Sequence, residues 1–132
     1  IGRRRVFEVL QQVGLAEDAR RRVRTFSLGM AQRLGIAAAL LGEPEVLVLD
    51  EPTNGLDPGG ICWVRDLVRS QARAGGTVLL SSHVMGELAE VVDDVVVIAG
   101  GTVRAAGSLE QVTAGFDSLE AAFFTLTEAG PR

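Results

Sequence analysis

Residues 46–58 read "VLVLDEPTNGLDP", and the fold class can be inferred outward from them. Four apolar residues lead into two adjacent carboxylates, Asp50 and Glu51, and then into a turn containing Gly55 and a third carboxylate, Asp57. An unbroken run of Val and Leu is typical of a strand covered on both faces. Because an ionised carboxylate is costly to bury without compensation, this strand is expected to end at an edge where a ligand offsets the charge.

The composition favours a soluble globular chain of one domain or less. The 132 residues are 47% apolar and 23% charged, which excludes a disordered chain. The longest apolar stretch, residues 34–42, is too short to cross a bilayer. The start, "IGRRRVFEVLQQ", lacks the pattern of a signal peptide. A single cysteine, Cys62, excludes an internal disulfide framework and fits a reducing cytoplasm.

Alternating helix and strand patterns predict the fold class. The predicted helices cover residues 6–13, 27–42, 58–74, 84–92 and 118–127, and the predicted strands cover 46–49, 77–82 and the two sides of a hairpin at 100–101. Ser108 and Gln111 form a predicted capping box. This order predicts an α/β fold with a largely parallel sheet flanked by helices.

The basic residues near the start are interpreted as a solvated helix surface. Residues 1–24 carry seven arginines against three carboxylates, with runs at 3–5 and 20–22. A basic patch can bind nucleic acid, but no aromatic residues are interleaved with these arginines. A solvated surface is therefore preferred to a binding patch, and no nucleic-acid partner is expected.

The strand end at residue 50 carries the first functional signal. Ligands of open α/β sheets bind outside the carboxyl ends of the strands, where Asp50 and Glu51 are predicted. An apolar strand that ends in Asp-Glu is the Walker B pattern of nucleotide-hydrolysing P-loop proteins. In that pattern the Asp supports Mg²⁺, and a carboxylate can orient the water that attacks the nucleotide. Alternation along the strand predicts that the two side chains face different parts of the ligand. The alternative is that Asp-Glu merely ends a strand and begins a polar turn.

Two further stretches can be read functionally or structurally. In "FSLGMAQR", residues 26–33, Ser27 is the predicted cap of a helix whose N-terminus can bind an anion; the alternative is a helix cap alone. In "LLSSHV", the only histidine, His83, follows the second strand. It is a candidate phosphate ligand, and the alternative is a structural polar group.

The ordered series "FSLGMAQR", "VLVLDEP", "NGLD" and "SSH" resembles the C-terminal half of the ATP-binding-cassette (ABC) ATPases. The resemblance continues through "ELAEVVDDVVVIAGGTVRAAG" to "SLEAAFFTLT" and is similar in character to bacterial drug and antibiotic exporters. It implies part of a P-loop NTPase domain. Residues 1–42 would end the helical signature subdomain, 43–107 would form the core with Walker B, D-loop and switch histidine, and 108–132 would form C-terminal helices.

The resemblance also implies site residues and two cofactors, ATP and Mg²⁺. Ser27 and Gly29 match the signature loop, which contacts the γ-phosphate bound to the opposite subunit, and Gln32 matches a residue just after it. Asp50 matches the Mg²⁺-supporting acid, and Glu51 matches the catalytic carboxylate that polarises water.

Asp57 matches the loop that communicates across the dimer, and His83 matches the switch histidine at the γ-phosphate. Arg33 follows the signature. The sequence departs from the usual signature at Phe26, Leu28 and Met30.

The chain contains no lysine, so the Gly-rich phosphate loop with its Lys is absent from it. We expect that these 132 residues alone neither bind nor hydrolyse ATP, and that exposed sheet edges make them poorly soluble. The resemblance implies a head-to-tail homodimer or heterodimer of ATPase subunits and a separate transmembrane permease, at the inner face of the plasma membrane. Two alternatives stay open: an ABC-type ATPase without a permease, acting in DNA repair, on chromosomes or on ribosomes, and a non-catalytic truncated remnant.

Overall fold

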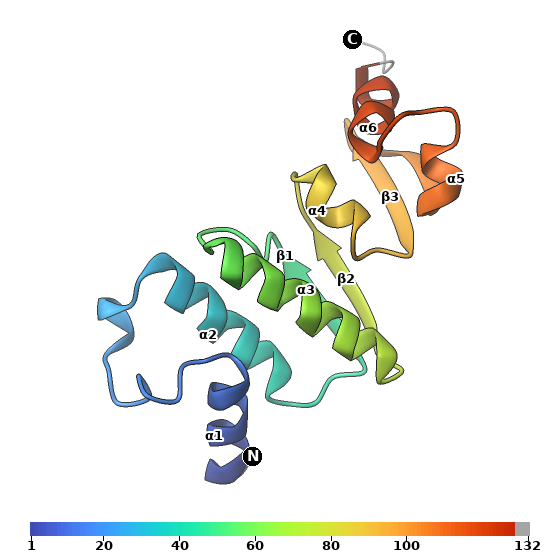
Figure 1. The fold of residues 1–132 in the computed structure, drawn as a ribbon. Coiled ribbons are helices and arrows are strands. Elements are labelled where there is room, and N and C mark those ends of the chain that lie inside the picture. The colour runs from blue at the N-terminus through green and yellow to red at the C-terminus, as the bar shows by residue number, and fades with distance from the viewer. Residues whose placement is uncertain (129–132) are drawn as a thin grey trace. The chain divides into compact units, whose positions relative to one another are not determined.

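The computed structural model describes residues 1–128 and divides into two compact units, Ile1–Ser82 and His83–Arg132 (Figure 1). Each unit has its own cluster of buried apolar side chains. The elements of the first unit are α1 (Arg3–Gln12), a 3₁₀ turn (Val23–Thr25), α2 (Leu28–Leu40), β1 (Val46–Asp50), α3 (Pro58–Arg73) and β2 (Thr77–Ser81).

Helices α2 and α3 begin at the capping residues that the sequence predicts. The Ser27 hydroxyl oxygen accepts a hydrogen bond of 3.2 Å from the Met30 N–H. The Asp57 carboxylate accepts one of 2.8 Å from the Gly60 N–H, and Pro58 occupies the first turn of α3. Both side chains satisfy N–H groups that have no partner within the helix, which confirms the expected helix starts.

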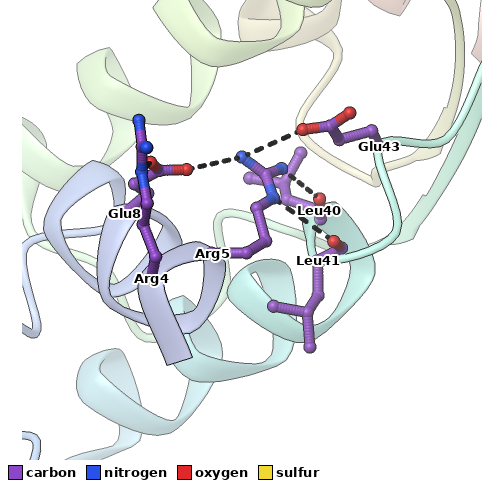
Figure 2. Close-up of polar contacts among 6 residues, drawn as sticks. All are labelled: Arg4, Arg5, Glu8, Leu40, Leu41 and Glu43. Carbon is purple, nitrogen blue, oxygen red and sulfur yellow. Dashed lines mark hydrogen bonds and ion pairs between the residues drawn. The ribbon is translucent and has the colours of Figure 1, made fainter. Parts of the chain in front are cut away.

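The C-terminal end of α2 is held by an arginine of α1. Arg5 donates through Nη2 to the Leu40 carbonyl at 2.8 Å and through Nε to the Leu41 carbonyl at 3.3 Å (Figure 2). Carbonyls at a helix end lack intrahelical partners, so Arg5 links α1 to α2. The expected solvated surface is therefore wrong for Arg5, whose side chain is 27% exposed, and confirmed for Arg4, which is 93% exposed.

Strands β1 and β2 form a parallel two-stranded sheet, which confirms the predicted parallel pairing. One face is buried: Leu47 and Leu49 pack in one cluster with side chains of α1, α2 and α3. The other face is exposed, with Val48 at 63% and its register partner Leu79 at 62%. The prediction of strands covered on both faces is wrong, because the helices of this unit all pack on one side of the sheet.

The second unit contains α4 (Met85–Ala89), β3 (Asp94–Ala99), β4 (Thr102–Ser108), α5 (Leu109–Thr113) and α6 (Leu119–Glu128). Strands β3 and β4 are antiparallel, and Gly100 and Gly101 between them both have positive φ, at 58° and 72°. That conformation is required by a tight two-residue hairpin turn, as predicted. The capping box of Ser108 and Gln111 is confirmed, whereas the helix predicted to reach residue 92 ends at Ala89.

Candidate functional site

The two parallel strands bring their carboxyl ends to one edge of the sheet. In the register, Asp50 at the end of β1 lies opposite Ser81 at the end of β2. The Ser81 hydroxyl donates a hydrogen bond to the Asp50 carboxylate. Sequence reasoning missed Ser81. The signal was present, however, because "VLVLD" and "TVLLS" are parallel strands of equal length that end side by side.

Glu51 lies beyond the end of β1 in a left-handed conformation, with φ 47°. For a residue with a side chain this conformation costs about 1–2 kcal/mol. Its N–H donates to the Ser81 carbonyl at 3.2 Å and to the Ser81 hydroxyl at 3.0 Å. The expected strand-type alternation of Asp50 and Glu51 is therefore wrong, because the strand ends at Asp50 and Glu51 begins a turn.

Gln32 of α2 contacts this same turn. Its side-chain Nε2 donates to the Glu51 carbonyl at 3.2 Å, and that carbonyl also accepts from the Asn54 N–H at 3.1 Å. Helix α2 and the two strand ends therefore meet at the backbone of Glu51.

The start of α2 packs directly on the turn that follows β1. A Cβ added at Gly29 would lie 3.0 Å from the Gly55 carbonyl oxygen, so the two backbones touch. A Cβ added at Gly55, whose φ is +75°, would lie only 2.5 Å from Cγ of Leu28. Glycine is thus required at positions 29 and 55, because the start of α2 and the turn after β1 lie too close together for a larger side chain. Ser27 remains exposed at the N-terminus of α2, where helix N–H groups favour an anion.

The residue after Gln32 is structural. The Arg33 guanidinium lies 4.5 Å from the centre of the Trp63 ring of α3 and donates to the Val13 carbonyl at 3.2 Å. Trp63 Nε1 donates to the neighbouring Gln12 carbonyl at 3.3 Å. A cation over an indole ring is a favourable contact, so this cluster ties the end of α1 to α2 and α3.

The structure gathers six of the seven predicted site residues in the first unit: Ser27, Gly29, Gln32, Asp50, Glu51 and Asp57. The Asp57 carboxylate caps α3, and it is exposed. His83 is the first residue of the second unit, two positions beyond the end of β2, and it is also exposed.

The carboxylate at the end of β1 is of the ligand type that Mg²⁺ takes in proteins. Within residues 1–128, no three His, Cys, Asp or Glu side chains are grouped to bind a metal. Mg²⁺ commonly keeps several waters and takes one or two carboxylates together with phosphate oxygens. The Asp50 carboxylate, oriented by Ser81, fits such a site and would supply one oxygen ligand directly or through water. None of the described helices combines the length and apolar character needed to cross a membrane.

Comparisons with known proteins show which family the chain resembles. The ABC transporter family profile matches residues 2–54. The chain is 53% identical over 95 residues to the bacitracin transport ATP-binding protein of Bacillus licheniformis, covering 71% of this chain and 31% of that protein. It is 43% identical over 130 residues to a daunorubicin resistance ATP-binding protein of Streptomyces coeruleorubidus, covering 97% of this chain and 40% of that protein.

A solved structure of the ATP-binding subunit of an ABC transporter superposes on 93% of this chain with a TM-score of 0.84 at 31% identity. The chain covers 53% of that structure, and it spans between about a third and a half of the length of these relatives. The fold of the chain is thus that of ABC transporter ATP-binding subunits. This chain belongs to the ABC transporter family and carries part of its ATP-binding domain.

Proposed function

We propose that the chain supplies the hydrolytic edge and the signature loop of an ATP site in an ABC transporter subunit. One observation carries the proposal. Asp50, Glu51 and Ser81 meet at the carboxyl ends of two parallel strands, the place where open α/β sheets bind ligands.

Each residue has a distinct proposed role at this edge. When bound, Mg²⁺ would neutralise phosphate charge during transfer to water. Asp50 would support that ion, Glu51 would orient the attacking water, and His83 would contact the γ-phosphate. The charge of the two adjacent carboxylates supports this assignment, since a cation is the natural compensation for them.

The signature residues would serve a second copy of the subunit. In the proposed head-to-tail dimer, Ser27 and Gly29 close the ATP site of the partner, Gln32 follows them, and Asp57 communicates across the interface. The exposure of Ser27 and Asp57 supports this role, because both are accessible to another chain. Residues 1–42, 43–107 and 108–132 would then be the end of the signature subdomain, the core and the C-terminal helices.

The transport function is proposed from the relatives. Two of them are named for bacitracin transport and for daunorubicin resistance, which favours an exporter of antibiotic-like compounds. Such a subunit would act in the cytoplasm, at the inner face of the plasma membrane, with a separate permease. These names favour a transporter subunit over an ATPase that works without a permease.

The chain by itself is expected to be inactive, because it contains no lysine to complete a phosphate loop. Isothermal titration of Mg-ATP into the 132-residue chain should show no binding in the micromolar range. Micromolar binding would contradict the proposal that this chain holds only part of the ATP site.

The proposed magnesium role can be tested in an intact subunit that carries this sequence. Asp50→Asn should raise the Mg²⁺ concentration needed for half-maximal ATP turnover by about tenfold or more, because it removes the charge opposite the cation. Glu45→Gln is the matched control, since Glu45 is an exposed carboxylate just before the other end of β1. An unchanged Mg²⁺ requirement in Asp50→Asn would overturn the assignment.

A further inference from the structure

The conformation of Glu51 requires an explanation. Among residues 1–128, two residues other than glycine have positive φ, Glu43 at 51° and Glu51 at 47°. Glu43 follows the last turn of α2, where a left-handed residue is an ordinary way to end a helix. Glu51 follows a strand instead, so no helix end accounts for its conformation. Strained backbone of this kind persists only where surrounding contacts over-determine it.

Two side chains supply those contacts, one to the N–H and one to the C=O of Glu51. Ser81 accepts the Glu51 N–H through its hydroxyl oxygen at 3.0 Å and donates the hydroxyl proton to Asp50. Gln32 donates to the Glu51 carbonyl at 3.2 Å. The N–H and the C=O of one residue are thus bound by a strand on one side and by α2 on the other.

We propose that Gln32 and Ser81 are positioning residues that together hold Glu51 in its left-handed conformation. This inference rests on the proposed hydrolytic role of Glu51. It gives Gln32 a task within its own chain in place of a direct contact with nucleotide. It also makes the placement of Glu51 depend on α2, the helix whose first turn carries the signature residues.

Ser81 and Gln32 act differently on Asp50 and Glu51. Loss of the Ser81 hydroxyl removes the contact to Asp50 and one contact to the Glu51 N–H, whereas the bond to the Ser81 carbonyl at 3.2 Å remains. Loss of the Gln32 amide leaves Asp50 untouched and releases only the Glu51 carbonyl, which keeps its bond from Asn54. Ser81 variants should therefore also raise the Mg²⁺ requirement, and Gln32 variants should not.

The test uses Gln32→Ala and Ser81→Ala in an intact subunit without nucleotide. Hydrogen–deuterium exchange is followed in the peptide that covers residues 50–55. Each substitution should speed exchange in this peptide about five- to tenfold, because each removes one ordinary hydrogen bond that holds the turn. Ser81→Thr keeps the hydroxyl and should restore the slow exchange.

The matched control is Gln71→Ala. The Gln71 side chain also donates to a backbone carbonyl, that of Pro44 at 3.1 Å, just before the opposite end of β1. Its removal should leave exchange in residues 50–55 unchanged, which separates local release of Glu51 from a general loss of stability.

Steady-state ATP turnover is the second measurement. A shifted catalytic group lowers the chemical step more than binding, so kcat should fall about tenfold or more in Gln32→Ala and Ser81→Ala while KM for ATP changes less than about twofold. The Gln71→Ala variant should stay near wild type, and Ser81→Thr should recover most of the turnover that Ser81→Ala loses.

The outcomes distinguish this inference from the proposed function. Unchanged exchange in both alanine variants would show that Gln32 and Ser81 do not hold Glu51, whatever the turnover. Faster exchange with unchanged kcat overturns the positioning role. If Glu51→Gln itself retains turnover, the hydrolytic role fails, and the exchange result still decides whether Gln32 and Ser81 hold the turn.

Discussion

The contact between Leu28 and Gly55 provides a quantitative test of how the start of α2 packs on the turn after β1. Gly55→Ala introduces two separate penalties. The φ of +75° costs an alanine about 1–2 kcal/mol. The new Cβ would also lie 2.5 Å from Cγ and 2.6 Å from Cδ2 of Leu28. Overpacking typically costs about 1–3 kcal/mol. Because Leu28 is 69% exposed, its side chain can turn aside, so the cost of this overlap should be about 1 kcal/mol.

Gly55→Ala should therefore lower the free energy of unfolding by about 2–3 kcal/mol. Gly75→Ala separates the two terms, because Gly75 has φ +90° and nothing within 4 Å of its added Cβ, so it pays only the backbone cost of about 1–2 kcal/mol. In the double variant Leu28→Ala with Gly55→Ala, about 1 kcal/mol of the loss should be recovered.

The assay is urea unfolding of the 132-residue chain, followed by the emission of Trp63, the only tryptophan. Trp63 lies against the first-unit core and under Arg33, so its emission reports on the unit that contains Gly55. If Gly55→Ala costs no more than Gly75→Ala, or if Leu28→Ala recovers nothing, the contact between α2 and the turn is not formed.

Two further predictions concern the first unit. Arg5→Met should lower the free energy of unfolding by about 1–3 kcal/mol, because it leaves two carbonyls at the end of α2 without their donors. Arg4→Met removes only a surface ion pair and should change the free energy of unfolding by less than about 0.5 kcal/mol. Equal effects of the two substitutions in urea titrations would contradict the capping role of Arg5. Val48→Thr with Leu79→Thr should raise the soluble yield of the isolated chain and change stability by less than about 0.5 kcal/mol, as expected for surface sites. Leu47→Thr on the buried face should cost about 2 kcal/mol or more, so similar losses on both faces would show that the exposed face is packed.

Local patterns sufficed for the starts of α2 and α3 and for the hairpin turn. The capping roles of Ser27 and Asp57 follow from residue type and spacing alone, because the partner of each lies three residues along the same chain. The hairpin at Gly100 was equally predictable, since few residues tolerate positive φ.

Contacts between distant residues could not be predicted in the same way. Arg5 looks like any exposed arginine in the sequence, and only the fold places it at the end of α2, 35 residues away. The apolar run of β1 was typical of a strand covered twice, but apolar composition does not reveal whether the covering segment lies in this chain. The left-handed turn at Glu51 was missed because its stabilising partners, Gln32 and Ser81, are 19 and 30 residues away.

ATP turnover by Glu51→Gln in an intact subunit tests the account's central claim, that the carboxylate beyond β1 drives hydrolysis. The substitution preserves the size of the side chain and removes the charge that is proposed to orient water. Loss of a general base typically costs 10²–10⁴-fold, so turnover should fall by about 10²-fold or more while ATP affinity stays within a few-fold. Glu45→Gln, placed just before the other end of the same strand, should turn over ATP as the wild type does. Turnover of Glu51→Gln within a few-fold of wild type would contradict the account.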